Sequence, residues 1–186
     1  MDAVYIGIDP GTHQSGFCAL VSGEIAPQHF GVFQNSALLA HTEGVLQQLA
    51  DKIPFGSPVR VGVEMIACYG MPVGKETFET CLWIGKFVSF FPRVGCSVQI
   101  RKVYRREVKH HLCNSAKAKD ANVRQALIDK YHSTGGGSIA QIGTKGHPGP
   151  LYGIKSHIWA ALAVAITARD TWADLETFLQ TEKTKS

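Results

Sequence analysis

The sequence has few charged residues and lacks a long hydrophobic run. Charged residues make up 18% of the 186 positions and hydrophobic residues 45%, a balance that excludes disorder over most of the chain. The longest apolar run, residues 158–168, is interrupted only by Thr167 and falls short of the roughly 20 residues that span a bilayer. We therefore expect no insertion into a membrane.

Paired cysteine motifs are also missing. The five cysteines lie at positions 18, 68, 81, 96 and 113, without a CxxC motif or a spacing typical of a zinc finger. An odd, scattered set predicts reduced and mostly buried thiols, as in proteins of the cytosol. The N-terminus runs directly into a strand-like segment and shows no signal-peptide pattern. These features predict a cytoplasmic protein.

The length of the chain suits one domain with a sizeable core and is too short for two ordinary domains. We therefore expect a single domain over residues 1–186. Within it, residues 132–155 are rich in glycine and contain no acidic residue, which predicts a flexible loop. Two interpretations of this loop stay open: a plain flexible insertion, or a cationic loop that becomes ordered on nucleic acid.

The pattern of apolar residues and turns predicts an α/β protein with a mixed five-stranded sheet flanked by helices. The first three strands, at 4–9, 16–21 and about 25–33, are joined by turns and are expected to be antiparallel. A helix is expected to begin at Asn35 or Ser36 and to end at Asp51. The remaining predicted elements are strands at 59–64 and 96–100 and helices at 74–91, 105–112, 119–131 and 156–170.

Acidic residues are almost absent between positions 101 and 119, where Glu107 stands alone against seven basic residues. This clustering is more informative than the formal net charge of +4, which many proteins without a polyanionic ligand share. It predicts either a nucleic-acid-binding patch or the solvated face of a surface helix. The basic residues are Arg101, Lys102, Arg105, Arg106, Lys109, Lys117 and Lys119.

Two carboxylates stand at the ends of predicted central strands. Asp9 closes the first strand and Glu64 the fourth, and burying an unpaired carboxylate costs several kcal/mol. If these strands are neighbours, the two carboxylates converge into a hard-oxygen site suited to Mg²⁺ or Mn²⁺. The alternative is that each acid caps a turn or pairs with a base, and Asp-Pro-Gly is by itself an ordinary turn signature.

His157 is the third candidate, at the start of the last predicted helix. A single histidine there is more often a surface or hydrogen-bonding residue. Its imidazole has a pKa near neutrality, so it is also suited to binding a metal ion or to orienting or deprotonating a water molecule.

Four motifs in the same order resemble the RuvC group of Holliday-junction resolvases, which has an RNase H-like fold. G-I-D-P-G-T at 7–12, with Ser15-Gly16 after it, resembles the G-x-D-P-G-x-x-x-x-G start of the family. Val-Glu at 63–64 is similar to the second acid, and R-E-V-K at 106–109 to the opening of the basic segment. S-H at 156–157 with A-L-A at 161–163 resembles the closing helix. The segments at 64–75 and 149–153 look more like a phage and prophage subgroup, which would place the protein in the cytoplasm of a bacterial host.

The resemblance implies a homodimeric endonuclease that nicks branched DNA and leaves a 5′-phosphate. It implies that Asp9, Glu64 and His157 bind two Mg²⁺ or Mn²⁺ ions, and that Lys109, helped by Lys117 or Lys119, stabilises charge on the scissile phosphate. It further implies that the phosphate backbone is gripped by Arg101, Lys102, Arg105 and Arg106.

Two further implications concern apolar and aromatic side chains. The helix at 78–91 is a candidate dimer face. In the loop after Glu64, Tyr69, or secondarily Met71, is a candidate wedge that enters the opened junction and stacks on an unpaired base. Tyr69 is equally suited to closing that loop against the core.

The chain departs from the family pattern at three points. Ala160 stands where the closing helix usually carries a fourth acid. Asp120 stands where the family has a second lysine, so it is either an extra acid or a helix N-cap, with Lys117 or Lys119 in the lysine's place. The stretch between Glu64 and residues 84–85 is longer than in bacterial RuvC.

Three alternatives follow from these departures and motifs. The first is a related nuclease acting on RNA or on other branched DNA. The second is a junction-binding protein without catalysis, which the alanine at 160 favours. An actin-like or sugar-kinase ATPase shares the Asp-x-Gly-Thr start, but it needs a second domain for which the chain has no room.

Overall fold

The computed structural model describes residues 3–50, 54, 56–68, 70, 72–91 and 97–183. Five strands form one mixed sheet in the order β3-β2-β1-β4-β5. The strands β1 (Val4–Asp9), β2 (Gln14–Val21) and β3 (His29–Gln34) are antiparallel neighbours, and β4 (Val59–Met65) and β5 (Val98–Tyr104) continue the sheet in parallel with β1. The predicted α/β fold with a mixed five-stranded sheet is therefore confirmed.

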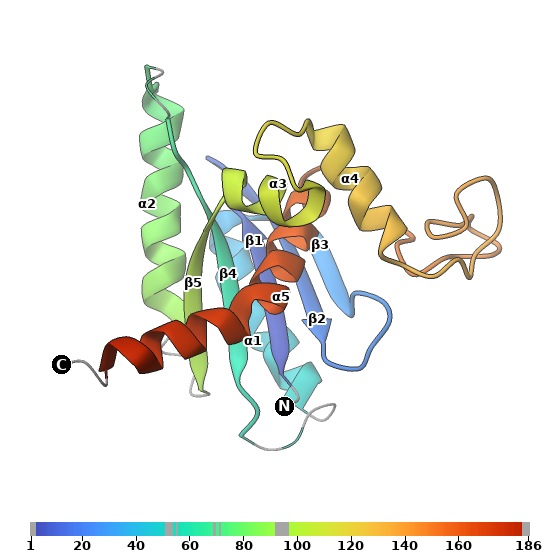
Figure 1. Cartoon of the computed structure of the whole chain (residues 1–186), viewed down its shortest axis with the longest axis horizontal. Helices are drawn as coiled ribbons and strands as arrows, with labels where there is room; N and C mark the ends of the chain where they lie inside the picture. Colours follow the sequence, from blue (N-terminus) through green and yellow to red (C-terminus); the bar gives the residue numbers. More distant parts are fainter. Residues whose placement is uncertain are drawn as a thin grey trace.

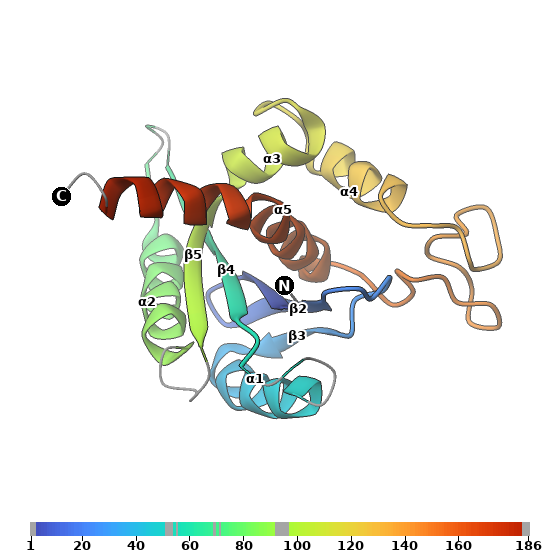
Figure 2. The ribbon, with the colours of Figure 1, turned by 60° about the horizontal axis from the view of Figure 1, so that its bottom comes forward.

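Helices cover both faces of the sheet. The helices α1 (Asn35–Ala50) and α2 (Lys75–Phe90) pack on one face. The helices α3 (Arg105–Cys113), α4 (Asp120–Asp129) and α5 (His157–Lys183) lie on the other, where α5 crosses the central strands (Figures 1 and 2). Each central strand alternates its side chains between two apolar layers: Ile6 and Ile8 face α1 and α2, while Tyr5 faces α5.

Glycines on the α5 face of the sheet allow the helix backbone to touch the strands directly. A Cβ atom added at Gly7 would lie 2.0 Å from the carbonyl oxygen of Ala161 and 2.5 Å from the amide nitrogen of Ala165. At Gly16 it would lie 2.4 Å from the carbonyl oxygen of His157. The absence of side chains at these positions therefore sets the distance between α5 and the sheet.

We expect Gly7→Ala to destabilise the protein by about 3 kcal/mol, because the added methyl group must push α5 away from β1. The measurement is chemical unfolding followed by circular dichroism. Gly44→Ala on α1 is the matched control, since no atom beyond the adjacent residues and the helix's own backbone lies within 4 Å of the added group there, and it should be neutral or stabilising by about 0.5–1 kcal/mol. Equal stability of the two variants would contradict the backbone contact.

The structure corrects three predicted boundaries. The third strand begins at His29 rather than near Ile25, because Ile25 is exposed in the preceding turn. The strand β5 continues to Tyr104 instead of ending at Ile100, since it pairs with β4 as far as Met65 opposite Tyr104. The helix α5 continues past Asp170 to Lys183.

The cysteine prediction was wrong in part. Among the cysteines in the described ranges, Cys18 is buried, Cys113 is half-buried, and Cys68 and Cys81 are exposed, all as free thiols. Within the same ranges, no helix has both the length and the apolar character needed to cross a membrane.

The glycine-rich segment 132–155 extends beyond α4 (Figure 1) and is organised by backbone hydrogen bonds. The amide of Gly135 donates to the carbonyl of Ala140, and the amide of Gly149 donates to the carbonyl of Ile142. Leu151 is fully buried near the end of the segment and anchors the return of the chain to the core. The flexibility of this loop and its ordering on nucleic acid stay predictions.

Candidate active site

The two predicted carboxylates lie side by side at one end of the sheet. The strands β1 and β4 are parallel neighbours with Ile8 opposite Val63, so the next residues, Asp9 and Glu64, follow at the same level. Both face the α5 side, because Ile8 and Val63 point into the opposite apolar layer. The side chains of Asp9 and Glu64 are 17% and 13% exposed, so both carboxylates are held in a largely desolvated position.

The turn after Asp9 is fixed by the buried side chain of Asn35. Its amide group donates to the carbonyls of Gly11 (2.9 Å) and Thr12 (3.2 Å), and its Oδ1 accepts from the hydroxyl of Ser15 at 2.6 Å. Asn35 is also the first residue of α1. The start of this helix therefore holds the Asp9 turn in place.

The third predicted residue joins the two carboxylates. His157 is the first residue of α5, and its Nδ1 lies 2.9 Å from Oδ2 of Asp9. The contact of α5 with Gly16 brings the start of the helix close to the end of β1. The structure thus brings Asp9, Glu64 and His157 to one place, with the imidazole 57% exposed at the surface.

Burial makes the two carboxylates reluctant to ionise together. Burial and the charge of Asp9 raise the pKa of Glu64 to about 7. Burial likewise raises the pKa of Asp9, although the contact with His157 opposes this. Oε2 of Glu64 is buried and has no hydrogen-bond partner. In the absence of another cation, the pair therefore retains a proton near neutral pH.

These residues fit a divalent cation. A buried carboxylate oxygen without a hydrogen-bond partner, beside a second carboxylate, is a hard-oxygen donor set suited to a divalent cation. Among the described residues, no three Asp, Glu, His or Cys side chains already form a metal-binding group. Binding would therefore require His157 to adjust or water molecules to complete the coordination, which Mg²⁺ commonly retains.

Sequence reasoning missed the central position of Arg105 in this site. The Arg105 guanidinium lies between two acids, with Nη1 3.7 Å from Oε1 of Glu64 and Nη2 2.8 Å from Oδ1 of Asp120. Nζ of Lys109 lies 3.6 Å from the same Asp120 oxygen. The hydrogen bond from Arg105 holds the pKa of Asp120 below its usual value. Lys119 is the N-cap of α4, so Asp120 is the extra acid and not the cap.

The site opens into a cavity of about 690 Å³ between the sheet end, α4 and α5. Ala160 also lines it, so the position where the resemblance leads us to expect a fourth acid contributes only a methyl group. Arg124 lies over the ring of Trp159 at 4.9 Å, and both line the cavity. These two residues were also not predicted, because neither belongs to a recognisable motif.

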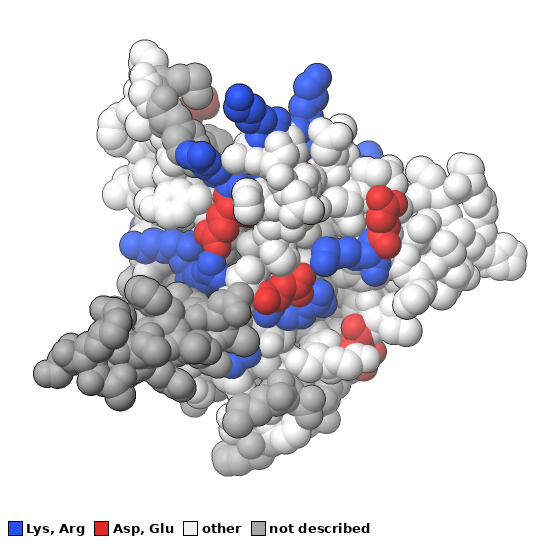
Figure 3. Space-filling model, viewed as in Figure 1, with Lys and Arg blue, Asp and Glu red and all other residues white. Residues whose placement is uncertain are grey.

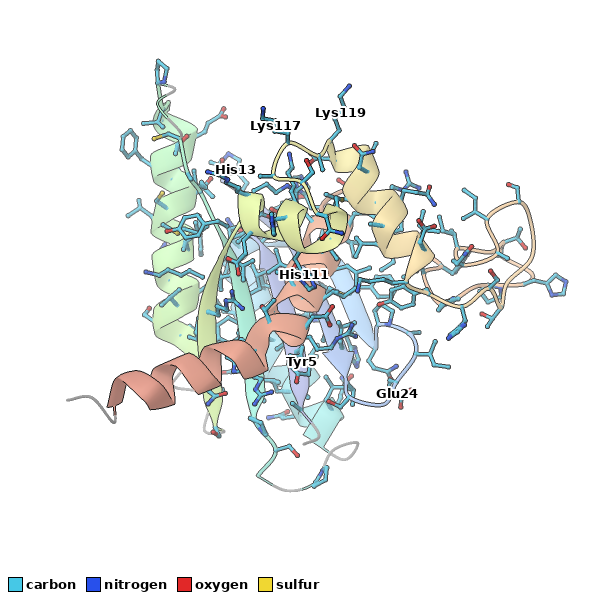
Figure 4. All side chains as sticks on the ribbon, in the orientation of Figure 1. Tyr5, His13, Glu24, His111, Lys117 and Lys119 are labelled. Atoms are coloured by element: carbon cyan, nitrogen blue, oxygen red, sulfur yellow. The ribbon has the colours of Figure 1, made fainter. Side chains whose placement is uncertain are left out.

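The remaining predicted nucleic-acid residues fall into two groups. Arg101 forms an ion pair with Glu107 and a hydrogen bond with Thr171, and its side chain is only 17% exposed. Its charge is therefore partly neutralised within the protein. The other four are exposed at the surface of β5, α3 and the α3–α4 connection, and Figure 4 shows that Lys117 and Lys119 point away from the body. Figure 3 shows basic side chains on this face with acidic ones between them. The exposed residues are Lys102, Arg106, Lys117 and Lys119.

Tyr69 and Met71, the candidate wedge residues, lie outside the described residues.

Comparison with known proteins identifies the fold. No protein-family model and no curated protein sequence matches the chain. Among solved structures, it is similar to a Thermus thermophilus RuvC structure at a TM-score of 0.59 and 18% identity, covering 91% of this chain and 95% of the other. It is also similar to T. thermophilus RuvC in complex with a Holliday junction substrate, at a TM-score of 0.55 and 17% identity, covering 92% and 95%. The chain therefore has a RuvC-like fold.

Proposed function

We propose that the protein is a metal-dependent DNA endonuclease that nicks four-way junctions. The observation that carries the proposal is the buried pair Asp9 and Glu64, with an unpartnered carboxylate oxygen and His157 beside it, at the mouth of an open cavity. The similar structure with a bound Holliday junction substrate supports the choice of substrate. We also propose that the protein belongs to the phage-type subgroup and acts in the cytoplasm of a bacterial host.

The carboxylates of Asp9 and Glu64 would hold two divalent cations, with His157 as a further ligand or as the group that positions water. Bound Mg²⁺ or Mn²⁺ would activate the attacking water and stabilise the leaving oxygen, giving a 5′-phosphate and a 3′-hydroxyl. Because Nδ1 of His157 faces Asp9, the carboxylate fixes the orientation of the ring and leaves Nε2 for the water. Lys109, near Asp120, would add positive charge beside the scissile phosphate.

The exposed basic residues would bind the phosphate backbone. Lys102, Arg106, Lys117 and Lys119 lie on the surface around α3 and before α4, on the same side of the sheet as the cavity. Contacts of this kind give an affinity that depends strongly on salt and weakly on sequence. We expect Arg101 to contribute less, since it is paired with Glu107. Tyr69 remains the proposed wedge.

A homodimer would present two such sites to the paired arms of a junction. The outer face of α2 supports this arrangement, because Phe78 and Leu82, one helical turn apart, are 61% and 68% exposed. Large apolar side chains this exposed are uncommon on the surface of a monomer when they are adjacent. We therefore propose α2 as part of the dimer face.

The experiment that tests the proposed function is a nicking assay with a metal series. The purified protein with Mg²⁺ or Mn²⁺ should nick a four-way junction about tenfold or more faster than linear duplex of the same sequence. Replication forks, flaps and RNA hybrids provide the other arms of the panel. Equal cutting of junction and duplex would indicate a less selective nuclease, and preferred cutting of another arm would reassign the substrate.

A junction-binding protein without catalysis is the second candidate, and Ala160 is the observation that favours it. The cavity wall carries a methyl group where an acid would complete the metal site in the resembling family. This candidate predicts tight junction binding without nicking by any metal in the series. Ala160→Asp would then be expected to create nicking activity, whereas an active wild type would exclude this candidate.

A further inference from the structure

Arg105 is the cation that lies beside Glu64 in the candidate active site. It is the first residue of α3, directly after β5, and it lines the cavity together with Asp9 and Glu64. Its side chain is 29% exposed, and its Nη1 atom is buried without a hydrogen-bond partner. Nη1 faces Glu64 and is closed off from solvent, so the part of the guanidinium open to a ligand is the exposed remainder, which lines the cavity.

Asp120 holds this guanidinium from the other side. Its Oδ1 accepts from Nη2 of Arg105 at 2.8 Å, while Glu64 lies at the longer distance of 3.7 Å. Asp120 itself is 72% exposed and begins α4. The shorter and better-formed contact is thus made by the acid that does not belong to the Asp9 and Glu64 pair.

We infer that Arg105 binds a phosphate oxygen of the DNA strand in the cavity, and that Asp120 is the positioning residue that keeps its guanidinium there. The inference rests on the proposed function: the resemblance already implied that Arg105 contacts the phosphate backbone, and the new element is its place in the cavity and the role of Asp120. A planar guanidinium can contact a carboxylate on one edge and a phosphate on another, which an ammonium group cannot do with the same geometry. Without Asp120, the guanidinium would be free to turn onto Glu64.

This arrangement reverses the ordinary electrostatic expectation for Asp120. Removing an exposed acid from a DNA-binding surface should strengthen binding, because the acid repels phosphate. If Asp120 acts by holding Arg105, its removal weakens binding instead. The sign of the change in affinity therefore separates the two roles.

The test is a double-mutant cycle measured by junction binding in EDTA, so that no cleavage is required. Arg105→Ala should weaken binding about tenfold and Asp120→Ala about threefold to fivefold. In the Arg105→Ala background, Asp120→Ala should cause no further loss. Arg105→Lys, which keeps the charge, should fall between wild type and Arg105→Ala, and thermal unfolding should show that each variant is folded.

Asp129→Ala is the matched control, because Asp129 is an exposed acid at the other end of α4 whose Oδ1 accepts from Gln125. It should leave binding unchanged or slightly stronger. Tighter binding by Asp120→Ala, or an equal loss in both backgrounds, would overturn the inference even if the wild type nicks junctions. A wild type that binds DNA without nicking it would overturn the proposed catalysis. The double-mutant cycle would then still test whether Arg105 and Asp120 act together in binding. A wild type that binds no DNA would overturn both.

Discussion

Asp9→Asn should reduce junction nicking by about a thousandfold or more, equivalent to about 4 kcal/mol in the barrier. The amide keeps the shape of the side chain and removes the charge that a divalent cation needs. It also removes the carboxylate that orients the His157 ring at 2.9 Å. The measurement is single-turnover nicking of a labelled junction at saturating protein.

Junction affinity separates a catalytic defect from a binding defect in this variant. Binding by Asp9→Asn should be retained or slightly strengthened, since a negative charge leaves the cavity. Asp129→Asn, the same change on the exposed face of α4, is the control and should nick at the wild-type rate. Nicking by Asp9→Asn at more than about a tenth of the wild-type rate would contradict the assigned role.

Glu64→Gln should make the metal-free protein more stable at pH 8, by about 1 to 3 kcal/mol. Burial and the charge of Asp9 raise the pKa of Glu64 from 4.5 to about 7 in the folded protein. Between these values the folded state binds more protons than the unfolded state, so stability falls as the pH rises. The stabilising contribution of protonated Glu64 is full below about pH 4.5 and is lost by the time the pH exceeds 7.

The pH dependence supplies the critical comparison for this variant. The difference in stability between Glu64→Gln and wild type should be present at pH 8 and should vanish near pH 4.5, as measured by urea unfolding in EDTA. Glu43→Gln, an exposed position on α1, should show no such difference. A Glu64→Gln variant less stable than wild type at pH 8 would show that the ionised Glu64 carboxylate does not destabilise the folded protein.

Divalent cations should stabilise the wild type at pH 8, as the Glu64→Gln substitution does. Mg²⁺ or Mn²⁺ added at pH 8 should raise the unfolding temperature of the wild type, because a bound cation replaces the missing proton. The response should be much smaller in Glu64→Gln, which has lost a ligand oxygen. This arm reports metal binding without any nuclease assay.

The sequence predicted the position of Asp9 and Glu64 because two simple patterns coincide there. Each acid ends a predicted apolar strand, and the two acids were expected to converge if those strands were neighbours. The structure confirms that β1 and β4 are adjacent and parallel. His157 was placed beside them by its motif alone, since nothing in the local pattern specifies which end of α5 meets which strand.

The pairing of Arg105 with Asp120 could not be predicted from the sequence. The two residues begin different helices and are separated by the α3–α4 connection, so no periodicity links them. The predicted basic patch ended at Lys119, one residue before Asp120, so it did not include the acid that lies beside Arg105. Only the folded chain shows that this acid neutralises part of the basic segment.

Arg101 illustrates the same limit. It belonged to the predicted basic patch, but the continuation of β5 to Tyr104 turns Arg101 toward Glu107 and Thr171. The predicted end of the strand was four residues too early. Arg101 was therefore expected to be a surface cation, whereas the structure pairs it with Glu107 within the protein.

The backbone of α5 touches β1 and β2 directly at Gly7 and Gly16. This contact determines which residues can be replaced without changing the geometry of the site. The spacing between His157 and Asp9 is set by main-chain atoms meeting at Gly7 and Gly16, and main-chain atoms are the same in every sequence. Neighbouring core residues can therefore drift over generations without altering that spacing, provided that the two glycines persist. Genetic selection on this chain should accordingly tolerate many replacements in the apolar layers and almost none at these two positions.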